Sequence, residues 1–79
     1  MYMAVVEDYN PIISFGEGAI IAKRQALEKV KQMELEYNGH IINSSWDQIT
    51  EYYGGYCIEI KGGDCFKESD IKTGLIKTI

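Results

Sequence analysis

The sequence lacks the features that define three large classes of protein. It has only two cysteines and one proline and no low-complexity stretch, so it offers neither a disulfide scaffold nor a linker between domains. No apolar run approaches the roughly 18 residues of a membrane span, and the start Met1-Tyr2-Met3 lacks the basic and then apolar pattern of a secretory signal. These absences exclude membrane proteins, cystine-rich secreted modules and large multidomain enzymes, and we expect a cytoplasmic protein.

Basic residues are missing from the middle of the chain. The net charge is −4 at pH 7, and residues 21–31 hold half of the Lys and Arg side chains. Residues 32–60 carry no Lys or Arg and five acids, which are Glu34, Glu36, Asp47, Glu51 and Glu59. Proteins that bind a nucleic-acid backbone need clustered Lys and Arg to displace its counterions. Direct binding of DNA or RNA is therefore disfavoured.

What the chain does have is the composition of a small folded domain. Its 79 residues are 46% hydrophobic and 25% charged, which is the ordinary mixture of a globular protein. A chain this short buries only about 60% of the surface that it exposes when unfolded. We expect a single domain over residues 1–79 with one modest core.

The first residues have the pattern of a β-hairpin. Two short apolar runs, residues 2–6 and 12–15, flank the turn signal Asn10-Pro11. A tip at these two residues pairs Tyr9 with Ile12 and Val6 with Phe15. The predicted core side of this hairpin consists of Tyr2, Ala4, Val6, Ile13 and Phe15.

A long amphipathic helix is predicted over residues 19–37. At about 100° per residue its apolar positions form a narrow stripe, flanked by Ile20 and Leu27. The stripe consists of Ala19, Ala22, Ala26, Val30, Met33 and Tyr37. Its alanines allow the helix to lie close to a sheet, and Gly39 suits a left-handed cap at its end.

The second half of the chain leaves alternatives open. Residues 40–42 could form a third strand. Ser44 or Ser45 could cap a helix over residues 46–53, although Thr50 to Tyr53 also suit a strand. Apolar and polar residues alternate over residues 56–60, which predicts a strand. Residues 61–64 resemble a hairpin turn, and residues 65–67 would form the returning strand. The tail from Ser69 fits a helix or a strand equally, and we expect it to be docked on the domain.

These elements predict an α+β fold. We expect a small antiparallel sheet of three to five strands with one long amphipathic helix on one face and, where the helical alternative holds, a second short helix. Cys57 and Cys65 should not bond within one hairpin, and their spacing does not match a zinc site with His40. Gly16-Glu17-Gly18 resembles a strand-to-helix turn more than a phosphate loop. We predict no catalytic residue, metal or cofactor, and therefore a protein that is not an enzyme.

Aromatic residues gather in the same segment as the acids. Trp and Tyr are enriched at the energetic centres of protein interfaces, although some of these rings must also fill the core. We predict a water-facing, partner-binding surface made of Glu34, Glu36, Trp46, Asp47, Glu51, Tyr52 and Tyr56. Leu35 and Ile21 lie opposite the apolar stripe and could instead form the contact surface of a homodimer.

The front of the chain resembles a known structural unit. The run Ile12-Ile13-Ser14-Phe15-Gly16-Glu17-Gly18, leading into Ala22 and Ala26-Leu27, resembles the hairpin and helix of HicB-type antitoxins and of small phage inhibitors, including some anti-CRISPR proteins. The resemblance covers roughly the first 37 residues, and the acidic aromatic segment after Gly39 departs from it. It implies a stoichiometric inhibitor without turnover, acting in the host cytoplasm if the protein is encoded by a phage.

Together these observations predict a binding protein. Its partner would be a basic protein, and the surface that it docks on would be one that binds nucleic acid. The alternative is a small-ligand-binding oligomer in which Tyr and Trp line a pocket for a cationic ligand.

Overall fold

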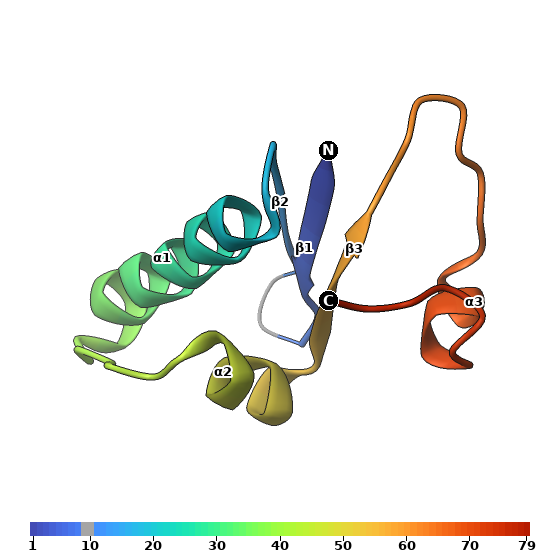
Figure 1. Cartoon of the computed structure of the whole chain (residues 1–79). Helices are drawn as coiled ribbons and strands as arrows, with labels where there is room; N and C mark the ends of the chain where they lie inside the picture. Colours follow the sequence, from blue (N-terminus) through green and yellow to red (C-terminus); the bar gives the residue numbers. More distant parts are fainter. Residues whose placement is uncertain (9–10) are drawn as a thin grey trace.

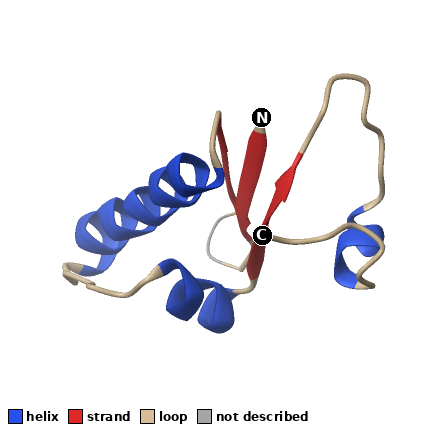
Figure 2. Cartoon of the chain, in the orientation of Figure 1, coloured by secondary structure: helices blue, strands red, loops and turns tan. Residues whose placement is uncertain are grey.

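The chain folds as a three-stranded antiparallel sheet with helices on either side of it, which confirms the predicted α+β class (Figure 1). This computed structural model describes residues 1–8 and 11–79. The elements are β1 (Tyr2–Val6), β2 (Ile12–Gly16), α1 (Ala19–Asn38), α2 (Trp46–Tyr53), β3 (Gly55–Glu59) and α3 (Glu68–Lys72). The strand order is β2-β1-β3, and Figure 2 shows α1 and α3 on opposite sides of the sheet.

The hairpin of β1 and β2 has a different register from the one predicted. Val6 lies opposite Ile12 rather than Phe15, a difference of three positions. Because side chains alternate along a strand, an odd shift exchanges the two faces of β2. Ile12 therefore faces the core, and the prediction that Ile13 and Phe15 do so was wrong, since their exposed fractions are 57% and 50%. Ala4 and Val6 were placed correctly and are fully buried.

The cause of the shift lies in the residues just after β1. The backbone N–H groups of Glu7 and Asp8 donate hydrogen bonds to the carbonyls of Gly54 and Tyr53, 3.0 and 3.1 Å away. These residues thus pair with the junction of α2 and β3 instead of continuing the hairpin, and the connection to β2 is longer than a two-residue tip. The predicted pairing of Tyr9, and Asn10 of the predicted tip, lie outside the described residues.

The core lies between the sheet and the helices α1 and α2. The predicted stripe is confirmed at Ala22, Ala26, Val30 and Met33, which are buried. It ends one turn earlier than expected, because Tyr37 is exposed. Across the interface lie Ala4, Val6, Ile12 and Cys57 of the sheet and Ile49 of α2.

Small residues let α1 approach the sheet closely. A β-carbon added at Gly16, at the end of β2, would lie 2.8 Å from the backbone nitrogen of Ala22. The Ser14 hydroxyl also donates a hydrogen bond to the carbonyl of Ala22. At the other end of α1, Gly39 adopts the predicted left-handed conformation, with φ 66°, and its N–H donates to Leu35.

Of the alternatives for the second half, the helix over residues 46–53 is correct. Ser45 caps α2 through a reciprocal pair of hydrogen bonds with Gln48, of 3.3 and 2.8 Å. Residues 40–42 and 65–67 do not form strands, and the turn between Lys61 and Asp64 is present. The backbone N–H of Ile79 instead donates to the carbonyl of Cys57, 2.8 Å away, so the tail lies beside β3 where a return strand was expected.

The tail is docked only in part. Ile71 of α3 is buried, whereas Leu75 and Ile79 are exposed. The helix begins at Glu68, one residue before the Ser69 that was expected to cap it.

Candidate protein-interaction surface

Helix α2 presents acids and an aromatic ring to solvent. Trp46, Ile49 and Tyr53 recur at helical spacing and pack against the core, so Trp46 is half-buried and not on the water-facing surface predicted for it. Asp47 and Glu51, four residues apart, are consequently exposed on the outer side of the helix. We call Asp47, Glu51 and Tyr52 the α2 surface.

Tyr52 is the aromatic side chain of this surface, and 79% of its area is accessible to solvent. Its ring meets the half-buried ring of Tyr53 edge to face, with centroids 4.7 Å apart and an interplanar angle of 86°. Such an arrangement suits the electrostatics of aromatic rings. Contact with Tyr53 therefore orients the Tyr52 ring, while most of its surface remains accessible to a partner.

The acids of the α2 surface form no ion pair with any residue that the structure describes. In the part of the chain that the structure describes, ion pairs form at Glu7, Glu34 and Glu68, and none forms at Asp47 or Glu51. Like charges four residues apart on a helix destabilise it by about 0.2–0.5 kcal/mol. Asp47 lies in the first turn of α2, where the helix dipole favours an acid, so the cost of this repulsion belongs to the addition of Glu51. Glu36, on α1, is also exposed, and it accepts a hydrogen bond from Gln32 at 3.4 Å.

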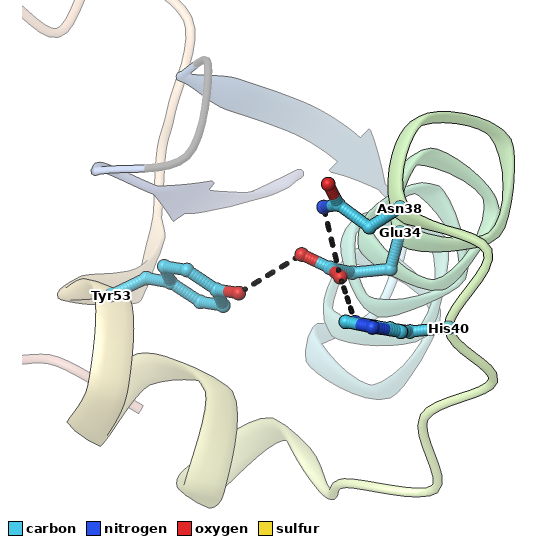
Figure 3. A network of polar contacts seen from close by, with 4 residues as sticks. All are labelled: Glu34, Asn38, His40 and Tyr53. Atoms are coloured by element: carbon cyan, nitrogen blue, oxygen red, sulfur yellow. Dashed lines mark hydrogen bonds and ion pairs between the residues drawn. The ribbon is translucent and has the colours of Figure 1, made fainter.

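Glu34 does not belong to the partner-facing surface on which the sequence placed it. It is 6% exposed and lies at the centre of a polar network between α1 and α2 (Figure 3). The Tyr53 hydroxyl donates to its Oε1 at 3.3 Å, and the Asn38 amide donates to its Oε2 at 3.2 Å. His40 Nδ1 lies 3.5 Å from the same Oε2. The carboxylate therefore joins the end of α1 to α2, because a buried charge is stable only when it is paired and hydrogen-bonded.

Tyr56 is also separated from the α2 surface. It lies opposite Val5 on the face of the sheet turned away from α1, whereas the neighbouring Cys57 faces the core. Its hydroxyl donates to Glu68 at 3.4 Å. Burial, followed by the negative charges of Glu68 and Glu7, raises the pKa of the Tyr56 phenol. Since Trp46 packs against the core on the other face, these two rings share no pocket within one chain.

The predicted surface is thus divided. Asp47, Glu51 and Tyr52 come together on α2, Glu36 is exposed on α1, and Trp46 is half-buried beside the core. Glu34 and Tyr56 serve other parts of the structure.

A second feature, beside Tyr56, was missed from the sequence. A hollow of about 310 Å³ lies on the outer face of the sheet, and we call it the sheet hollow. Its lining includes the apolar Met3, Val5 and Ile13 and the polar Glu7, Asp8, Tyr56 and Glu68. In the sequence, the adjacent acids Glu7 and Asp8 after β1 were the one indication of this hollow. The predicted hairpin register, which was wrong, had placed Ile13 on the opposite face of the sheet.

Lys72 of α3 lies at the rim of the sheet hollow. Its ammonium is 3.0 Å from Glu7 Oε2 and 3.5 Å from Glu68 Oε1. The hydrogen bond and the charge of Glu7, followed by the charge of Glu68, raise the pKa of the Lys72 ammonium.

The cysteines and the other metal-ligating side chains of the described residues do not gather into a catalytic or metal site. Cys57 and Cys65 are free thiols, the first buried and the second exposed, and burial raises the pKa of Cys57. Within residues 1–8 and 11–79, no three His, Cys, Asp or Glu side chains are grouped so as to hold a metal ion. None of the helices described there is both long and apolar enough to cross a membrane.

Comparison of the chain with models of protein families, with curated proteins and with solved structures found no match.

Proposed function

We propose that this protein is a non-enzymatic, stoichiometric inhibitor that binds a basic protein surface through α2. The observation that carries the proposal is the α2 surface, where a highly exposed tyrosine lies beside two carboxylates that form no ion pair among the described residues. Tyrosine buries a large area at low entropic cost, which makes it an effective interface anchor.

The unpaired acids add direction to this binding. Complementary charge accelerates the encounter of two proteins and fixes their register. The mutual repulsion of Asp47 and Glu51 would also be relieved when a cationic surface docks on them. A partner with Lys or Arg facing α2 therefore gains from features that the isolated chain does not use.

Basic surfaces of the required kind commonly bind nucleic acid. An acidic protein that occupies such a surface competes with the phosphate backbone, because both offer negative charge to the same Lys and Arg side chains. The resemblance of the hairpin and helix to HicB-type antitoxins and small phage inhibitors agrees with this role. The alternative, an oligomer that binds a small cationic ligand, would need rings from more than one chain.

The test compares two double variants with the same change in net charge. The first is Asp47→Lys with Glu51→Lys, and the control is Glu17→Lys with Glu28→Lys, which are exposed elsewhere. A protein captured by the wild type from lysate is purified and titrated, while bound to fluorescent nucleic acid, with each form.

We expect the wild type and the control to release the nucleic acid with an end point at one equivalent, and the α2 variant to release little. Release by the α2 variant equal to that of the control would contradict the proposal. A melting temperature that rises with a small metabolite, together with no effect on the captured protein, would favour the ligand-binding alternative.

A further inference from the structure

The outer face of the sheet is only partly covered by the chain itself. Its strand residues alternate with those that face the core, and they include Val5 and Ile58, which are buried. On β2, however, Ile13 and Phe15 keep half or more of their area exposed. The sheet hollow lies on this face and includes Ile13 in its lining. An apolar floor therefore continues from the hollow onto open strand surface.

The charge around the sheet hollow is one-sided. Glu7, Asp8 and Glu68 supply three carboxylates, and Lys72 supplies one ammonium. Lys72 lies between Glu7 and Glu68, so this rim already binds a primary ammonium group at the edge of an apolar surface. Lys and Arg side chains combine an aliphatic stem with a charged head, so they match an apolar floor with an acidic rim.

Lys72 is also a replaceable occupant. Its side chain is 55% exposed, and it belongs to a helix of only five residues. Exposed ion pairs of this kind are worth about 0–1 kcal/mol. A second cation presented by a larger binding surface would therefore compete with it effectively.

We propose that the sheet hollow docks an extended basic segment of a partner protein, with a Lys or Arg head between Glu7 and Glu68 and apolar side chains over Ile13 and Phe15. The floor of this site lies on the opposite face of the sheet from the core on which α2 packs, and only its rim residues Glu7 and Asp8 bond to the backbone at the end of α2. The volume of about 310 Å³ is at the small end of the range for ligand pockets. The exposed apolar surface beyond it favours a polypeptide over a free small cation.

The probe is a fluorescein-labelled eight-residue peptide of alternating lysine and leucine, with a matched peptide in which glutamine replaces lysine. Fluorescence anisotropy measures the affinity, and amide chemical shifts identify the residues affected. We expect the lysine peptide to bind and to shift the amides of Val5, Ile13 and Tyr56. The glutamine peptide should bind at least about tenfold more weakly, since a charge-assisted hydrogen bond contributes about 1.5–3 kcal/mol.

Four variants separate this site from a general attraction to acids. Glu7→Gln and Glu68→Gln should each weaken binding by about tenfold. Lys72→Met should tighten it by about two- to fivefold, because the internal competitor is gone. Glu28→Gln, which removes the same charge from the exposed side of α1, should leave it unchanged. The thermal unfolding of each variant verifies that it is folded, and Lys72→Gln replaces Lys72→Met if the latter is not.

Several outcomes would overturn the proposal. They are an unchanged affinity in both Gln variants, no tightening without Lys72, and chemical shifts that map to α2. Displacement of the peptide by N-acetyl-lysine methylamide at equal concentration would also overturn it, because a free small cation would then suffice. None of these outcomes bears on the release of nucleic acid by the α2 surface.

Discussion

The hydroxyl of Tyr53 donates a hydrogen bond to the buried carboxylate of Glu34, 3.3 Å away and 19 positions earlier in the chain. This bond links the last turn of α2 to the last turns of α1. It explains why two residues of the acidic aromatic segment are unavailable to a partner, since one neutral donor and one carboxylate satisfy each other inside the fold.

The first prediction tests the structural role of this bond. Tyr53→Phe leaves Glu34 with one donor fewer in a buried position, which should lower the free energy of unfolding by about 1–3 kcal/mol. Urea denaturation measures the change. Tyr52→Phe is the matched control, because that ring is exposed, and it should change stability by no more than about 0.5 kcal/mol. Equal effects of the two substitutions would show that the network contributes nothing.

The second prediction concerns the conflict between stability and binding on α2. Glu51→Lys replaces a repulsion with Asp47 by an attraction at the same spacing, and should raise the free energy of unfolding by about 0.5 kcal/mol. The same change should weaken capture of the proposed basic partner. The free energy of unfolding, measured by denaturation, should therefore rise in this variant while its affinity for the partner, measured by titration, falls. A variant that is both less stable and fully active would be inconsistent with this account.

The third prediction tests the close approach of α1 to the sheet. Gly16→Ala puts a β-carbon 2.8 Å from the backbone nitrogen of Ala22, where no flexible side chain can move away. We expect a loss of about 1–3 kcal/mol from overpacking. Gly18→Ala is the control, since a β-carbon there meets no atom within 4 Å. The difference between their unfolding midpoints is the measurement, and a negligible difference would mean that α1 lies further from β2.

The fourth prediction is a loss of stability in alkaline solution. The pKa values of Cys57, Tyr56 and Lys72 are all raised in the folded state, from ordinary values of 9.0, 10.0 and 10.5. As pH rises above about 9, the unfolded chain loses protons that the folded chain retains, so the free energy of unfolding falls. Urea denaturation at several pH values measures the slope. Cys57→Ala and Tyr56→Phe should each make it shallower, and a stability that rises with pH in this range would refute the assignment.

The sequence predicted those elements whose residues agree locally with the final fold. The period of Ala22, Ala26, Val30 and Met33 and the stop at Gly39 defined α1, because pattern and cap both depend on neighbouring residues. For α2 the sequence offered a helix capped by Ser44 or Ser45 beside a strand, and the capping pair of Ser45 and Gln48 shows that the deciding signal was also local. Both signals act over a few residues, so no long-range information was needed.

The errors came from contacts between distant segments. The register of β2 depends on bonds from Glu7 and Asp8 to residues near position 54, which no local rule contains. The burial of Glu34 depends on Tyr53 in the same way. A carboxylate in a run of acids has the composition of a surface residue, and only its donors from other elements show that it is not one.

The contrast between the two thiols affects how the oligomeric state has to be measured. Cys57 has no accessible area, whereas Cys65 lies exposed in the loop after β3. In air, two copies can be crosslinked through Cys65 alone, and the resulting covalent pair would elute from a sizing column as a spurious dimer. Once the protein has been reduced and the reductant removed, that same sulfur becomes a single attachment point for a maleimide dye, without any engineered cysteine.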